Sequence, residues 1–272
     1  MPETRSSTLA QDTINDFGDQ WTHFTNNDGF YGSKELFEDI CAPLLSADDV
    51  RGLRVAEIGS GTGRIVQMLL ACGAAHVIAV EPSEAFDVLQ RNVAGFGDRV
   101  ECLRTTGDRL PDSQAVDLVI SIGVMHHIPE PGPAVKAAFN AVKPGGRCLV
   151  WLYGREGNRL YLSLTTPIRA ITTRLPHALV FAFAQFLAAV LQPYVWLSTW
   201  FPLPLNKYFA HVFGRMHRSK KVLIIYDQLR PAYARYYRRE EAVELLTAAG
   251  FGDVRVHHRH GYSWTVIGTR PK

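Results

Sequence analysis

The sequence has few cysteines, and they lie far apart. Cys41, Cys72, Cys102 and Cys148 form no C-x-x-C pair and no spacing typical of a metal module. We therefore expect neither a zinc module nor a disulfide framework, and four free thiols suit a reducing cytosol. Residues 2–19 are polar and acidic, with no apolar run behind a basic start. We accordingly expect no secretory signal and a cytoplasmic protein.

The sequence also lacks a large surplus of either charge. Its 29 basic and 26 acidic side chains leave a formal net charge of +3 in 272 residues. The densest basic run, Arg215–Lys221, is short and typical of a solvated surface. Because binding to nucleic-acid phosphates normally needs a basic patch or stripe, we expect no nucleic-acid partner. The hydrophobic content of 47% instead predicts a folded protein with a substantial core.

Short apolar runs alternate with helical patterns from residue 53 onward, which is typical of β-α-β units and a parallel sheet. The first five strands are expected at 53–58, 76–80, 100–104, 116–120 and 147–152. The helices between them are expected at 64–72, 83–93 and 133–142, the last ended by a turn at Pro144–Gly146.

The alternation stops after residue 154 and resumes near residue 238, with a helix at 240–249 and strands at 254–256 and 265–268. Because these last two strands are too close for a helical crossover, they must pair antiparallel. The fold class predicted is α/β: a doubly wound, Rossmann-like sheet of seven strands, mostly parallel, with an antiparallel last strand. Four segments follow: an N-terminal helical cap (1–50), an α/β core (51–154), an apolar helical insertion (155–230) and the end of the core with its hairpin (231–272).

A glycine-rich loop follows the first strand, in the sequence Glu57-Ile58-Gly59-Ser60-Gly61-Thr62-Gly63. Glycines let the backbone turn tightly and let a ligand approach it closely. Acidic residues follow the next two strands, in Glu81-Pro82 and in Gly107-Asp108-Arg109. Glu81 could accept hydrogen bonds from ribose hydroxyls. Asp108 could accept one from an adenine amino group, with the Arg109 backbone N–H beside the ring.

Together with residues 121–129 and Lys143–Gly146, these motifs resemble the class I S-adenosylmethionine-dependent methyltransferase family, and in particular its small-molecule branch, which includes quinone-biosynthesis methyltransferases. The resemblance covers 53–152 and, less closely, 236–270. It implies S-adenosylmethionine as the cofactor and S-adenosylhomocysteine as the product. It also implies that Glu57 and Gly59–Gly63 hold the methionine part, that Glu81 holds the ribose and Asp108 the adenine, and that Ser121, Ile122 and Gly123 line the sulfonium side.

Two groups of histidines follow strands of the predicted sheet, at 126–127 and at 257–260. Histidine is suited to act as a base near neutral pH, and ligands of such sheets lie beyond the carboxyl ends of the strands. We expect His126 to face the substrate, whereas the resemblance implies that His127 is a structural part of its loop. His260 and Tyr233 are further catalytic candidates. No carboxylate accompanies the histidines at a ligand-type spacing, so we expect no metal.

The insertion has no charged residue between His177 and Lys207. A helix is expected at 178–191, and Pro193 divides the apolar stretch into pieces shorter than a membrane span needs. Three interpretations of residues 178–204 stay open: a lid over the substrate, a hairpin at a membrane surface or homodimer contact, and a membrane span. The first two point to a hydrophobic or lipid-like substrate. At the other end, a helix over 17–24 is expected to cover the cofactor pocket, with Trp21 as its cap.

The sequence therefore predicts methyl transfer to O, N or C of a small hydrophobic metabolite. One alternative is a nicotinamide-dependent oxidoreductase, against which the G-x-G-x-G spacing, Glu57 and the terminal hairpin count. The other is a degenerate methyltransferase-fold binding subunit, against which the joint presence of Glu57, Glu81 and Asp108 counts.

Overall fold

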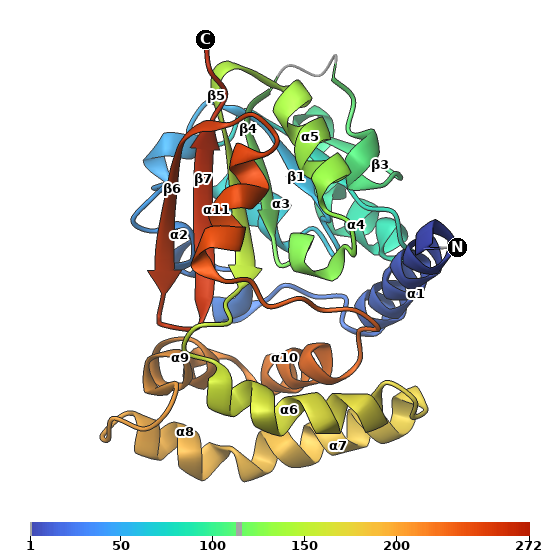
Figure 1. Ribbon diagram of the computed structural model, residues 1–272, viewed down its shortest axis with the longest axis vertical. Coiled ribbons are helices and arrows are strands. Elements are labelled where there is room, and N and C mark those ends of the chain that lie inside the picture. The colour runs from blue at the N-terminus through green and yellow to red at the C-terminus, as the bar shows by residue number, and fades with distance from the viewer. Residues whose placement is uncertain (1, 113–115) are drawn as a thin grey trace.

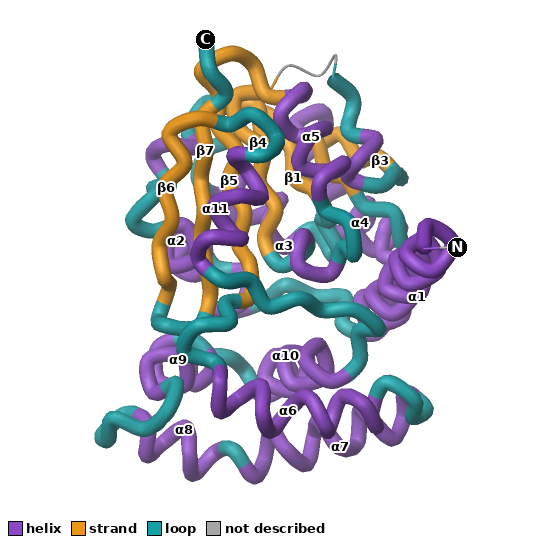
Figure 2. The backbone as a smooth tube through the Cα atoms, viewed as in Figure 1, coloured by secondary structure: helices purple, strands orange, loops and turns teal. Residues whose placement is uncertain are grey.

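The computed structural model describes residues 2–112 and 116–272, and it contains a seven-stranded sheet (Figures 1 and 2). The strands are β1 (Arg54–Ile58), β2 (His76–Val80), β3 (Val100–Leu103), β4 (Val116–Ile122), β5 (Val142–Tyr153), β6 (Gly252–Arg259) and β7 (Ser263–Thr269). Their order is β3-β2-β1-β4-β5-β7-β6, and β7 pairs antiparallel with both of its neighbours while the first five strands pair parallel. The predicted fold class is confirmed.

The turn expected at Pro144–Gly146 is instead part of β5. The pairing with β4 shifts register between Val116↔Val142 and Leu118↔Arg147, so the intervening residues bulge out of the ladder. Gly145 has φ +81°, and a Cβ on Gly146 would lie 2.8 Å from the carbonyl oxygen of Asp117. Glycines here therefore shape a bulge within a strand rather than a turn before it.

Successive side chains of the strands enter two different cores, because side chains on a strand alternate between the faces of a sheet. Val55, Val77 and Leu118 face one layer of helices, whereas Ala56 and Ile78 face the other. The first layer holds α2 (Lys34–Cys41), α3 (Arg64–Ala71) and the buried side of α4 (Ala85–Val93); the second holds α5 (Gly132–Ala141) and α11 (Arg239–Thr247).

The predicted insertion contains five α-helices: α6 (Arg159–Thr172), α7 (His177–Val190), α8 (Gln192–Ser198), α9 (Asn206–His211) and α10 (Arg218–Leu229). They form a separate layer below the carboxyl ends of the parallel strands (Figure 1). Small and aliphatic residues of α7, including Val180, Ala184 and Ala188, pack against α10 in a third core. The insertion is thus a folded layer with its own interior.

No single helix in the described residues meets the length and hydropathy of a membrane span. The pair α7 and α8 meets them together, but it bends by 41° at the break before Pro193.

The N-terminal helix α1 (Pro2–His23) is longer than the helix expected at 17–24. It runs along α4 at the side of the sheet (Figure 1), where a Cβ on Gly18 would lie 3.3 Å from the backbone nitrogen of Glu84. This places the side chains at its end against the cavity described below.

Asp39, on α2, binds the turn between β6 and β7 and so connects that turn to α2. Its carboxylate accepts hydrogen bonds from Arg259 Nε at 3.1 Å and from His260 Nε2 at 2.8 Å. Burial raises the pKa of Asp39, but the hydrogen bond from His260 and the charge of Arg259 outweigh burial and lower the pKa to about 2. The ionised carboxylate therefore stabilises the fold.

Replacing Asp39 with Asn should lower the free energy of unfolding at pH 7 by about 1–2 kcal/mol, allowing for the partial exposure of the pair. Since the pKa is depressed in the folded state, the stabilisation is complete above about pH 4 and is lost as the pH falls toward 2. The difference between wild type and variant, measured by urea unfolding, should shrink from pH 7 to pH 3. Glu38→Gln, on the same helix but in an exposed pair with Lys34, is the control. A difference independent of pH would contradict this role.

Candidate active site

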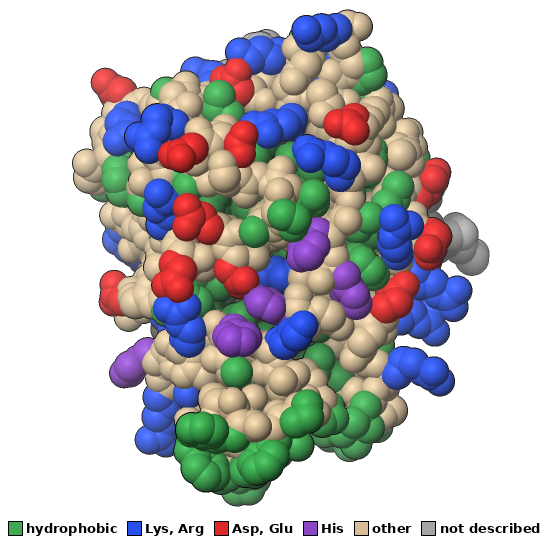
Figure 3. Space-filling model, turned by 90° about the vertical axis from the view of Figure 1, so that its left-hand side faces the viewer, with side chains coloured by type: hydrophobic (Ala, Val, Ile, Leu, Met, Phe, Trp, Pro, Cys, Tyr) green, Lys and Arg blue, Asp and Glu red, His purple; other side chains and the backbone are tan. Residues whose placement is uncertain are grey.

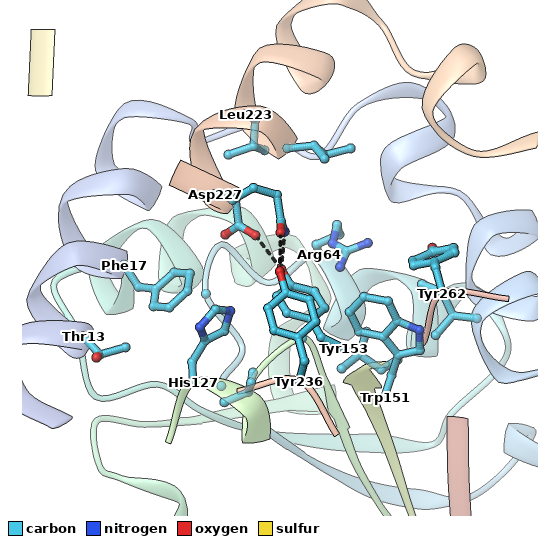
Figure 4. Close-up of a pocket in the computed structure, with 18 of the residues that line it drawn as sticks. Thr13, Phe17, Arg64, His127, Trp151, Tyr153, Leu223, Asp227, Tyr236 and Tyr262 are labelled. Carbon is cyan, nitrogen blue, oxygen red and sulfur yellow. Dashed lines mark hydrogen bonds between the residues drawn. The ribbon is translucent and has the colours of Figure 1, made fainter. Parts of the chain in front are cut away.

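A cavity of about 990 Å³ lies where the carboxyl ends of the strands, α1 and the insertion meet. One part of its wall is the glycine-rich loop with the residues that follow β2, β3 and β4. The opposite part comes from α6, α10 and the loops around α9, and most of its side chains are apolar or aromatic. Figure 4 shows polar groups from both parts, among them His127, Tyr153 and Asp227, gathered between these walls.

The glycine-rich loop brings bare backbone to the cavity. Gly59 has φ +79°, and a Cβ there would lie 2.4 Å from Val124 Cγ2, so both the conformation and the close approach require glycine. Residues 59–62 line the cavity. Gly63 does not; it precedes α3 and faces Leu89 instead. Trp21 lies over the loop, with its Nε1 3.2 Å from where a Cβ on Gly61 would be.

Glu57 is buried at the inner wall of the cavity, and its Oε2 has no hydrogen-bond partner among the described residues. Burial raises its pKa to about 8, outweighing the hydrogen bond with Ser60 and the charge of Arg64. The carboxyl is therefore mostly protonated at neutral pH in the absence of a ligand. A cationic amine beside it would supply the missing partner and favour the ionised form.

Glu81 joins the ends of β1 and β2. Its Oε2 accepts the Gly61 N–H at 2.7 Å, and its Oε1 accepts the Ser83 backbone N–H at 2.9 Å. Glu81 and Pro82 both line the cavity. A carboxylate has about four lone-pair positions, so Glu81 can hold the loop and still accept hydrogen bonds from a ligand.

Gly107 and Asp108, in the short helix η4 (Gly107–Arg109), also line the cavity, and Asp108 is exposed. Arg109 does not line it, and its backbone N–H, expected beside an adenine ring, is donated to the Thr106 carbonyl at 3.0 Å. The tight turn that aims Asp108 at the cavity uses this N–H for itself.

Of the three residues expected at the sulfonium side, two line the cavity and one does not. Ile122 and Gly123 line the cavity, whereas Ser121 is fully buried and donates from Oγ to the Ile58 carbonyl at 3.3 Å. The expected position of Ser121 is wrong, because its side chain is held inside the sheet by the hydrogen bond to the end of β1 and does not reach the cavity.

The orientations of the two adjacent histidines are the reverse of those expected from the sequence. His126 is fully buried behind the cavity, with its ring 3.8 Å from the ring of Tyr153. His127 faces the cavity beside Phe17, at 4.7 Å between ring centroids (Figure 4). The short helix η5 (Met125–His127) sets this orientation, which turns the second histidine outward and the first inward.

The hydrogen bond of His127 identifies its free nitrogen. Its Nδ1 lies 2.8 Å from the carbonyl oxygen of Tyr233, which can only accept, so Nδ1 carries the proton. In the neutral ring Nε2 is then unprotonated and able to accept a proton. Burial lowers the pKa of His127, and the charge of Asp227 partly opposes this. The ring is therefore neutral at physiological pH.

Tyr233 and His260 lie outside the cavity. Tyr233 contributes its backbone carbonyl to His127, as described above. His260 binds Asp39 through Nε2 and stacks near His211. The connection between β6 and β7 does reach the cavity, but through Arg259 and Tyr262.

A polar network from the insertion was not predicted. Asp227 and Gln228, on α10, both contact the hydroxyl of Tyr153, at 3.0 and 2.6 Å, and Gln228 Oε1 accepts the hydroxyls of Tyr161 and Tyr236 at 2.7 and 3.2 Å. Burial and Asp227 raise the pKa of Tyr153 well above 10, so it stays a neutral donor. One signal was present: Asp227 is the first acidic residue after Glu156.

Within residues 2–112 and 116–272, no three His, Cys, Asp or Glu side chains come together in a group that could hold a metal ion.

The strand order, the antiparallel β7 and the glycine loop define the class I methyltransferase fold. Residues 56–148 match the family model described as a methyltransferase domain. Over 128 residues the chain is 34% identical to demethylmenaquinone methyltransferase of Clavibacter sepedonicus, covering 43% of this chain and 51% of that protein. It is 29% identical over 150 residues to tRNA U34 carboxymethyltransferase of Cellvibrio japonicus, covering 53% and 46%.

A similar fold occurs in magnesium protoporphyrin IX methyltransferase from Synechocystis PCC 6803, solved with bound S-adenosylhomocysteine. The TM-score is 0.55 at 16% identity, over 97% of this chain and 99% of that one. Residues 56–148 therefore contain a methyltransferase domain similar to those of S-adenosylmethionine-dependent methyltransferases, and the cofactor of this domain is S-adenosylmethionine. It spans about half the length of the curated relatives it matches.

The cavity fits this cofactor, because the unpartnered oxygen of Glu57 matches its ammonium group. At neutral pH that oxygen belongs to a protonated carboxyl, so binding should release a proton. The affinity for S-adenosylmethionine should therefore rise between pH 6 and 7.5, by up to about tenfold per pH unit. Titration calorimetry in buffers of different ionisation enthalpy would count the released proton. Glu57→Gln should bind more weakly and lose the pH dependence; a pH-independent wild type would refute the assignment.

Proposed function

We propose that this protein is an enzyme that transfers a methyl group from S-adenosylmethionine to a small, apolar acceptor. The observation that carries the proposal is the continuity of the cavity from the glycine loop to the apolar wall of the insertion. Such a cavity can hold a polar cofactor and an apolar molecule side by side. One relative is named for demethylmenaquinone, a quinone substrate of that protein, which agrees with an apolar acceptor here.

In this proposal each polar group on the loop side holds one part of the cofactor. Glu57 and the backbone of 59–62 bind the methionine part, Glu81 and Pro82 contact the ribose, and Gly107 and Asp108 the adenine. Trp21 covers the loop from α1. Bound there, S-adenosylmethionine supplies a methyl group on a positively charged sulfur. The protein's main task is then to align the acceptor and exclude water.

His127 is the group we propose for the proton. For an acceptor that must lose a proton to become nucleophilic, Nε2 accepts it, while the Tyr233 carbonyl holds Nδ1–H and keeps the ring in the required tautomer. His126, Tyr233 and His260 have no direct part in this proposal, because they lie outside the cavity. The hydroxyls of Tyr153 and Tyr236 and the Gln228 amide orient the polar end of the acceptor.

The proposal places the protein in the cytoplasm, in peripheral contact with a membrane through residues 178–204. A homodimer through the same residues is the alternative. Either arrangement would cover the apolar outer side of α7 and α8.

Titration with S-adenosylmethionine, S-adenosylhomocysteine and NAD tests the cofactor. We expect binding of the first two only, and Asp108→Ala should weaken it by about 1–3 kcal/mol because a buried partner is left unpaired in the complex. Binding of NAD, or of neither adenosyl compound, would contradict the proposal. Methyl transfer to quinols and other apolar phenols would then separate an enzyme from a binding subunit.

His127→Gln should lower kcat by about 10²-fold or more, with the affinity for S-adenosylhomocysteine changed less than about twofold. Because burial lowers the pKa of His127, kcat/KM of the wild type should fall only below its ordinary pKa of 6.5, as Nε2 becomes protonated. The variant should lose this acidic limb. Tyr233→Phe leaves the carbonyl in place and should keep full activity. An unchanged pH profile in His127→Gln would exclude it as the base.

A further inference from the structure

The outer side of the insertion is an exposed apolar surface. Among the described residues, all ten large hydrophobic side chains classed as exposed lie between residues 160 and 201: Leu160, Leu164, Ile171, Leu179, Phe181, Phe186, Val190, Trp196, Trp200 and Phe201. We call these ten residues the apolar face. Figure 3 shows hydrophobic side chains gathered at the lower end of the molecule, where the insertion lies. Single exposed hydrophobic residues are ordinary, but a contiguous group marks an interaction site.

The structure of α7 shows that this exposure is not needed for packing. Val180, Ala184 and Ala188 form its buried stripe, every four residues, against α10. Leu179, Phe186 and Val190 form a second stripe on the outside, where a surface helix of a globular protein would carry polar residues. The helix α7 is therefore apolar on two sides, of which one packs against α10 and the other is exposed.

The charges around the apolar face are segregated. Residues 157–226 contain eight Lys and Arg residues and no Asp or Glu, whereas the rest of the chain holds 21 of the 29 basic residues and all 26 acidic ones. The overall charge of +3 thus divides into +8 on the insertion and −5 elsewhere. Arg159, Arg174, Lys207 and Arg218 are exposed. Basic side chains next to an anionic membrane surface each add about 1 kcal/mol to binding.

The cavity reaches the apolar face directly. Leu160 and Leu164, one turn apart on α6, line the cavity and are also 58% and 60% exposed. An apolar molecule could therefore pass from the outer surface into the cavity along these two apolar side chains.

From these observations we infer that the apolar face docks on a bilayer containing anionic lipid, and that the acceptor enters the cavity from that bilayer past Leu160 and Leu164. Tryptophans with flanking basic residues are typical of helices that lie in a membrane interface. A second copy of this chain is a poorer partner, because a two-fold interface brings the same patch of each copy together and would oppose the exposed Arg159, Arg174, Lys207 and Arg218 of the two copies. The inference rests on the proposed methyl transfer and names its membrane partner and the route of its substrate.

The full chain should co-float with phosphatidylcholine vesicles that contain phosphatidylglycerol, bind vesicles of phosphatidylcholine alone more weakly, and lose the difference in high salt. Trp200→Ser with Phe201→Ser should weaken binding to both kinds of vesicle at least about tenfold. Arg174→Glu with Lys207→Glu should reduce binding to the anionic vesicles by at least about tenfold. Arg255→Glu makes the same kind of charge change on β6, far from the apolar face, and should leave binding unchanged.

Two outcomes would overturn the inference. In the first, the protein is a monomer that binds neither kind of vesicle, which would make the insertion only a lid. In the second, sedimentation shows a concentration-dependent dimer that Trp200→Ser with Phe201→Ser abolishes, and the wild type binds no vesicle. Methyl transfer to an apolar phenol presented in anionic vesicles should fall in these variants, while transfer to a short-chain, water-soluble phenol is kept. Equal loss on both substrates would overturn the entry route. Titration with S-adenosylhomocysteine tests the proposed function separately, because cofactor binding does not require the apolar face.

Discussion

The hydrogen bond between the Gly61 N–H and the Glu81 carboxylate is the contact on which the site depends. It links the loop after β1 to the end of β2, and it forms only because glycines at positive φ let the loop backbone turn against Val124 and under Trp21. The same carboxylate receives the Ser83 N–H at the start of the next segment. One buried acid thereby fixes the relative positions of two strand ends that both border the cavity.

This arrangement leaves the neighbouring acid, Glu57, without a full set of partners. A buried carboxyl with an unpartnered oxygen is costly, and the raised pKa shows that protonation relieves part of that cost. Glu81 is satisfied by the protein and Glu57 is not, although both are buried carboxyls at the same cavity. The difference separates an acid that builds the loop from one that, in the proposed function, gains its missing partner from the cationic amine of the ligand.

The sheet was predictable because its strands are buried, short and separated by turn residues, and the strand-end positions of Glu57, Glu81 and Asp108 followed from that order. The orientation of single side chains was not. His126 and His127 differ by one residue, and only the local turn at Met125–His127 decides which faces inward. Asp227 and Gln228 meet Tyr153 across 74 and 75 positions of the sequence, so the packing of α10 under the sheet decides that contact, and no local pattern reports it.

The insertion has one apolar side that faces the protein and a second apolar side that faces outward. Closing the cavity over an apolar acceptor needs hydrophobic side chains facing inward, and the third core shows that the insertion can fold with only one side of α7 buried. A second apolar side facing outward adds nothing to that closure and risks aggregation in water. In the arrangement that we infer, a bilayer covers this outward side, and the positive charge of residues 157–226 favours an anionic surface over a second copy of the chain. The lid and the docking surface are then two sides of one layer.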